Sequence, residues 1–179
     1  MIKKFWSENV WMAGLATIIR ILLGYKWLDA GWNKLTGVET FDASGYVNNA
    51  LANPVMDRAT GEAMYPTYNA FLEHFALPNI DMINFLVPWG EFLVGLGLIL
   101  GTLTLPAVFF GLMLNFIFMF SGSVSMNPWL LLLGFIIMLA GSNAGRFGGD
   151  RFVLPWIKAT CSKLFGSGAK SDGVTAGNS

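Results

Sequence analysis

The stretch that decides the fold is residues 10–35, which read VWMAGLATIIRILLGYKWLDAGWNKL. A helix that crosses a membrane needs about 20 mostly apolar residues. This stretch is long enough, yet four charged residues interrupt it, Arg20, Lys26, Asp29 and Lys34. Because charge is costly in hydrocarbon, we expect a membrane helix whose charges meet protein or water. No small-residue cleavage site follows, so the pattern favours a retained helix over a removed signal peptide.

Three more apolar stretches predict membrane-spanning helices at residues 81–103, 106–121 and 127–142. Short turns separate these stretches, so neighbouring helices should run antiparallel. We therefore expect an all-α integral membrane protein, an antiparallel four-helix transmembrane bundle that forms a single domain over residues 1–165. Residues 166–179 are rich in Gly, Ser and Ala, and are expected to form a disordered cytoplasmic tail.

The segment 36–80 joins the first two predicted spans and carries apolar residues of its own. Its pattern predicts short amphipathic helices at 41–51 and 66–75, which we expect to fold back as a helical lid on the outer mouth of the bundle. A solvated connector is the alternative. After the fourth span, residues 150–165 have the spacing of a helix that lies in the inner membrane interface.

The distribution of cations predicts the orientation. Lys3 and Lys4 precede the first span, and the cations Arg146, Arg151, Lys158 and Lys163 follow the fourth. The segment 36–80 has one arginine against five acidic residues. Cytoplasmic loops are enriched in Lys and Arg, so both termini should be cytoplasmic and the lid should lie outside. Most tryptophans, Trp27 included, are expected to be anchors at the membrane interfaces, although Trp27 and Trp89 could line a cavity.

The composition excludes several classes of function. The formal net charge is zero, so nothing indicates nucleic-acid binding. The chain has one cysteine and one histidine, which rules out an internal disulfide and haem ligation by two histidines of this chain. We expect no metal site, because the usual His and Cys ligands are missing. Any redox group should be a substrate or belong to a partner, with no cofactor bound covalently.

Three polar residues occur about ten residues into three successive predicted helices: Arg20, Glu91 and Asn115. At about 1.5 Å per residue each would lie near the middle of the membrane. We predict that Arg20 and Glu91 pair, with Asn115 nearby. One interpretation is a structural ion pair that fixes the helix register, and the other is the polar floor of a ligand cavity beneath the lid.

Helical periodicity divides the polar residues of the first span between two stripes. One contains Arg20, Gly24, Trp27, Gly31 and Lys34, and the other contains Lys26, Asp29 and Asn33. Both stripes should face protein or water. Lys26 and Asp29 are three residues apart and could pair. In the second span, Gly97 and Gly101 form a GxxxG pattern, which predicts a close-packing face.

These residues resemble the DoxX/DoxD-like family of membrane proteins. The resemblance rests on Arg20 to Gly24 and Gly31 to Leu35 in the first span, and on Gly90-Glu91 followed by Gly95 to Thr104 in the second. Asn115 and the sequence Ser-Met-Asn-Pro at 125–128 fit the same pattern. The resemblance implies a four-helix membrane subunit linked to quinone redox chemistry, in the plasma membrane of a bacterium or archaeon. The family includes the membrane subunit of thiosulfate:quinone oxidoreductase, although we expect no appended domain for thiosulfate in this chain.

The expected function is therefore a quinone-reactive oxidoreductase subunit. Its expected catalytic residues are Arg20, Asp29 and Glu91, of which the carboxylates would exchange protons. Its expected quinone-binding residues are Lys26, Trp27, Lys34, Trp89 and Asn115, with aromatic rings flanking the quinone and cations stabilising its reduced oxyanion.

Two alternatives stay open. The chain could be a non-enzymatic scaffold that recruits soluble redox proteins through residues 146–165, or a small-solute transporter, although no internal repeat is evident. The expected partners are membrane lipid and quinone, a soluble redox subunit and further copies of the chain.

Overall fold

The computed structural model describes residue 6 and residues 9–165, and every regular element in this part of the chain is a helix. The helices are α2 (Val10–Thr36), α3 (Ser44–Ala52), α4 (Pro66–Phe71), α5 (Ile80–Leu100), α6 (Thr104–Phe120), α7 (Asn127–Ala140) and α8 (Asp150–Phe165). A π-helical turn, η1 (Leu72–Ala76), follows α4, and a 3₁₀ turn, η2 (Gly141–Gly145), follows α7. The all-α prediction is confirmed. The predicted disordered tail at 166–179 lies outside the described residues.

Three helices are long and apolar enough to cross a membrane: α2, α5, and α7 together with η2. Helix α6 is equally apolar but has 17 residues. These lengths indicate a membrane protein, and the fourth crossing stays a prediction. The bounds of all four helices lie close to those expected from the sequence.

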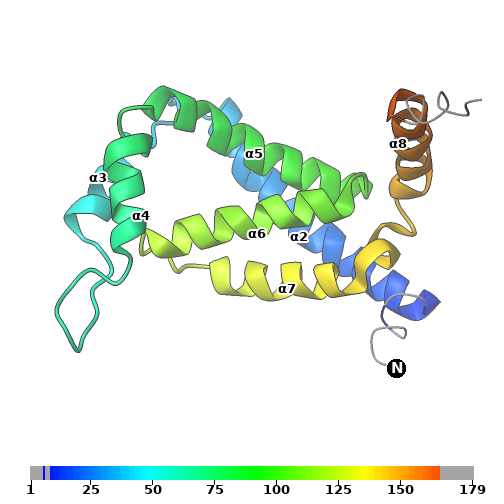
Figure 1. Ribbon diagram of the computed structural model, residues 1–179, viewed down its shortest axis with the longest axis horizontal. Helices are drawn as coiled ribbons and strands as arrows, with labels where there is room; N and C mark the ends of the chain where they lie inside the picture. Colours follow the sequence, from blue (N-terminus) through cyan, green and yellow to red (C-terminus); the bar gives the residue numbers. More distant parts are fainter. Residues whose placement is uncertain (1–5, 7–8, 166–179) are drawn as a thin grey trace, which may run out of the picture.

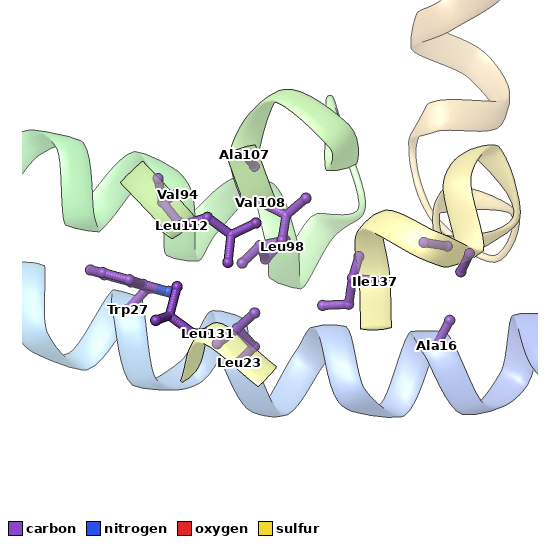
Figure 2. Close-up of a cluster of buried hydrophobic side chains, with 12 residues drawn as sticks. Ala16, Leu23, Trp27, Val94, Leu98, Ala107, Val108, Leu112, Leu131 and Ile137 are labelled. Carbon is purple, nitrogen blue, oxygen red and sulfur yellow. The ribbon is translucent and has the colours of Figure 1, made fainter. Parts of the chain in front are cut away.

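The four long helices run alongside one another (Figure 1). Helix α5 packs on α2 and α6, and α7 packs on α6 and α2. Their shared core is drawn in Figure 2, where Leu23 and Trp27 of α2 face Val94 and Leu98 of α5. Trp27 is only 3% exposed, so it is a core residue and not an interface anchor.

Three glycines bring α2 and α5 together. A side chain at Gly24 would meet Leu98, one at Gly31 would clash with the backbone of Phe92, and one at Gly95 would clash with the backbone of Leu28. The glycines of the GxxxG pattern, Gly97 and Gly101, are not the ones that form this contact between α2 and α5. A Cβ at Gly97 would meet Ala107 of α6, and Gly101 is the left-handed C-cap of α5 with φ 65°.

These contacts determine how α2 and α5 are aligned. Because Gly31 lies beside Phe92 and Gly24 lies beside Leu98, Arg20 reaches Gly101 at the very end of α5. Helix α2 therefore extends beyond the end of α5, where it contacts η2. The Nδ2 atom of Asn143 in η2 donates to the backbone carbonyl of Asn9, at 2.9 Å.

The segment between α2 and α5 packs on the C-terminal end of α6, at the opposite end of the molecule from α8 (Figure 1). The Tyr68 hydroxyl donates to the carbonyl of Ile117 at 3.0 Å and lies 2.7 Å from Oγ of Ser121. Burial raises the pKa of Tyr68 above its ordinary value of 10.0. At the start of the segment, the Ala43 amide donates to Oδ1 of Asn84 in α5, at 2.7 Å.

Helix α8 stands across the axes of the long helices (Figure 1). Its first turn is joined to the α5–α6 turn, because the Gly149 amide donates to the carbonyl of Leu100 at 3.0 Å and the Asp150 amide donates to that of Gly101 at 2.7 Å. Phe152 and Trp156 are exposed. The helix has the predicted bounds, and its place in the membrane interface stays a prediction.

Candidate functional site

A buried ion pair joins the two helices that pack most closely. The Nζ atom of Lys34, near the end of α2, donates to Oε2 of Glu91, in the middle of α5, at 2.5 Å. The side chain of Glu91 is 2% exposed and that of Lys34 is 28% exposed. The ammonium also lies 5.7 Å from the centre of the Phe41 ring, in the segment that follows α2. A carboxylate inside the helices is thus held by a lysine that water or ligand can reach.

The local sequence explains why this pair forms. Gly31 has no side chain, so α2 approaches the backbone of α5 at Pro88 and Phe92. Lys34 follows Gly31 by nearly one helical turn and Glu91 follows Pro88 by the same number of residues, so both project beside this contact. Any larger residue at 31 would separate the helices and the two charges.

The predicted pair between Arg20 and Glu91 was wrong. Glu91 pairs with Lys34, while the Arg20 guanidinium lies against Gly101 and Gly148, at the end of α5. The prediction assumed that the helices begin at a common depth. Helix α2 starts well before the level at which α5 ends, so ten residues from its start is not the depth of Glu91.

Arg20 belongs to a second polar cluster. It is 2% exposed, and its Nε and Nη1 atoms have no hydrogen-bond partner. The carboxylate of Asp150 supplies the opposing charge, and its Oδ2 atom accepts from the Thr104 amide at 3.2 Å. The Oδ1 atom of Asp150 and Oγ1 of Thr104 are also buried without partners. The cluster brings buried polar atoms of α2, α6 and α8 together at the end of α5, away from the Lys34–Glu91 pair.

Asn115 does lie near the level of Glu91. Gly111, one turn earlier in α6, packs on Val94 and Trp27, and Leu114 lies next to Gly90. Asn115 is buried, and its Oδ1 atom has no hydrogen-bond partner. A hydrogen-bond acceptor is therefore available inside the helices, near the Lys34–Glu91 pair.

Aromatic rings form a connected group on the outer surface of α2 and α5. Trp32 lies 6.1 Å from Phe92, Phe92 lies 5.9 Å from Trp89, and Trp89 lies 6.1 Å from Phe85, each between ring centroids. Trp32, Trp89 and Phe85 are exposed. We call these four rings the aromatic surface. Tyr25 is exposed but contributes no ring contact to it.

The structure does not bring the remaining predicted residues to this site. Lys26 and Asp29 are exposed on α2, and no ion pair joins them to each other or to another described residue. Trp27 lies in the core. No group of three His, Cys, Asp or Glu that could hold a metal ion was found among the described residues.

A family model described as DoxX matches residues 15–124. The chain belongs to the DoxX family. The part matching DoxX runs from α2 through α6, so it contains Lys34, Glu91 and Asn115, and it ends before α7 and α8. Asp150 lies outside it. No curated protein and no solved structure matches the chain.

Sequence reasoning missed the pairing of Lys34 with Glu91, and it missed Asp150, Phe92 and Trp32. The signal for the first was present, because Gly31 and Lys34 lie on the same stripe and Gly90-Glu91 were both singled out. Asp150 follows a glycine-rich turn, and its sequence position gives no sign that it lies near Arg20.

Proposed function

We propose that this DoxX-family protein is the membrane subunit of a quinone-linked oxidoreductase, and that quinone binds beside Lys34 and Glu91. The observation that carries the proposal is the buried Lys34–Glu91 pair between α2 and α5, the two helices that also carry the exposed aromatic surface. A lipid-soluble quinone needs an apolar surface for its ring and a few polar groups for its carbonyls. Helices α2 and α5 carry both features.

The roles of the residues follow from their chemistry. Reduction of a quinone to a quinol takes up two electrons and two protons. The ammonium of Lys34 would donate a hydrogen bond to a quinone oxygen and stabilise negative charge on it, and Glu91 would relay a proton through Lys34. Trp32 and Trp89 would stack against the ring. The electrons would come from a reduced partner subunit that oxidises thiosulfate or another small reductant.

The proposal includes the membrane topology. Four crossings, by α2, α5, α6 and α7, would leave both termini in the cytoplasm, as the cation bias favours. The segment 36–80 would then be an outer lid. Its contacts with α6 through Tyr68 and with Lys34 through Phe41 support this arrangement.

The test is quinone binding to the purified protein in lipid nanodiscs. Titration with a short-chain quinone should quench tryptophan fluorescence saturably. Lys34→Gln and Trp89→Leu should each weaken binding at least about tenfold, since each removes a main contact. The matched controls Lys163→Gln and Trp129→Leu change exposed residues on α8 and α7 and should bind normally. Unsaturable quenching, or equal losses in test and control variants, would refute the site.

A second candidate function, a scaffold for soluble redox proteins, is favoured by a separate feature. A cleft of about 560 Å³ lies between η2 and α8, and its lining includes Arg146, Arg151 and Lys158. This basic surface would suit an acidic partner. If the protein bound no quinone but Arg151→Glu abolished recovery of a soluble redox protein in mild detergent, the scaffold function would replace the quinone site.

A further inference from the structure

Helix α2 exposes Lys26 and Asp29, which carry opposite charges, at the level of the membrane-spanning stretch of α5. Lys26 and Asp29 lie between Gly24, which touches Leu98, and Gly31, which touches Phe92. Both charges are therefore level with α5 residues well inside Ile80–Leu100, which is long and apolar enough to span a membrane. The side chains are exposed, and neither has an ion-pair partner among the described residues.

Contact between lipid and this face of α2 would be energetically unfavourable. An ionised side chain near the middle of a membrane costs at least about 2.5–3.5 kcal/mol on insertion scales. Lysine can extend toward the headgroups, but aspartate is too short to do so. The face should therefore meet a protein surface with complementary charge.

The pattern on this face indicates what that surface is. Exposed residues recur at alternating spacings of four and three, which is the repeat of a helix that packs along another helix. They are Trp11, Leu15, Ile18, Leu22, Tyr25 and Asp29, with Lys26 and Asn33 beside them. The stripe covers about five turns of α2 and is apolar except near Lys26, Asp29 and Asn33.

We infer that a second copy of this chain covers the stripe, in a two-fold dimer with α2 packed along α2. In such an interface the same surface occurs on both sides, so each contact occurs twice. Lys26 of one copy would pair with Asp29 of its partner, and Asp29 with the partner's Lys26. The two residues are about 4.5 Å apart along the helix axis, a separation that the lysine side chain can span. The surface is thus complementary to itself.

The inference does not depend on the proposed quinone site. Lys26 and Asp29 lie on a different stripe of α2 from Lys34, so dimerisation and quinone binding can fail separately.

Charge reversal gives the sharpest test, with oligomeric state measured by native mass spectrometry from lipid nanodiscs and by dilution in liposomes. The wild-type chain should be dimeric. Lys26→Asp and Asp29→Lys each place like charges opposite each other and should weaken dimerisation at least about tenfold. The double variant Lys26→Asp/Asp29→Lys should dimerise like the wild type. The control Lys163→Asp, on α8, should not change the dimer.

Mixing the two single variants separates a lost interface from a lost fold. A Lys26→Asp copy and an Asp29→Lys copy have complementary surfaces, so differently tagged copies should form a mixed dimer although neither pairs with itself. Crosslinking locates the contact: in a Cys161→Ser background, Leu22→Cys should form a disulfide between copies and Leu139→Cys on α7 should not. A monomeric wild type, a dimer that both reversals leave intact, or no mixed dimer would overturn the inference.

Discussion

Lys34 and Glu91 are unequal partners, because the lysine is accessible and the carboxylate is buried. Removing the lysine leaves the buried carboxylate of Glu91 without a partner, whereas neutralising the glutamate leaves an ammonium that water can reach. We therefore predict that Lys34→Met lowers the free energy of unfolding by about 3–5 kcal/mol, and that Glu91→Gln lowers it by less. The measurement is reversible unfolding in detergent–SDS mixtures.

The double variant Lys34→Met/Glu91→Gln is the control for this prediction. It removes both charges and should be more stable than Lys34→Met alone. If Lys34→Met were the milder single substitution, the carboxylate would not be confined as described.

The close approach of α2 and α5 depends on glycine. Gly31→Ala and Gly95→Ala place a methyl group against backbone atoms of the other helix, and we predict a lower midpoint of thermal unfolding for both. The matched control is Gly14→Ala, also in α2, because a methyl group there would meet no neighbouring part of the chain within 4 Å. Alanine is the better helix former by about 1 kcal/mol, so this control should be neutral or stabilising. Equal effects at all three positions would contradict the packing.

The Arg20 cluster should behave as a coupled unit. Asp150→Asn removes the charge opposing a buried guanidinium, and Arg20→Met removes the guanidinium itself. We predict that the double variant is less destabilised than the sum of the two single variants, by a coupling free energy of about 0.5–3 kcal/mol. Glu62→Gln, on an exposed loop, replaces Asp150→Asn in the control cycle and should show additivity with Arg20→Met.

The ionised carboxylate of Asp42 should make the stability of α3 depend on pH. Hydrogen bonds from the side chain and amide of Ser44 lower the pKa of Asp42 below its ordinary value of 3.8. A lowered pKa means that the stabilisation is present above about pH 3.8 and is lost as the pH falls through the lower, folded-state value. Amide hydrogen exchange in α3 should therefore be faster in Asp42→Asn than in the wild type at neutral pH, and the difference should vanish in strong acid. A difference that persisted there would have another cause.

The helices could be predicted from the sequence, because apolar length and turn residues act locally. The buried stripe of α2 was also predictable, since Arg20, Gly24, Trp27 and Gly31 are all buried. The pairing of Lys34 with Glu91 could not be predicted, because the level of a residue relative to a neighbouring helix depends on where that neighbour begins. That offset is set by Gly31 against Phe92 and Gly24 against Leu98, which are contacts between distant parts of the chain. Asp150 was missed for the same reason.

Pro88 removes one helical hydrogen bond from α5. A proline has no N–H, so the carbonyl of Asn84 receives no helical hydrogen bond from residue 88. The side chain of Asn84 also accepts a hydrogen bond from the Ala43 amide, in the segment 36–80. A movement of that segment would pull on the turn before the proline and bend the helix there. The turn that carries Glu91 is anchored separately by Lys34, so such a bend would leave the carboxylate in position.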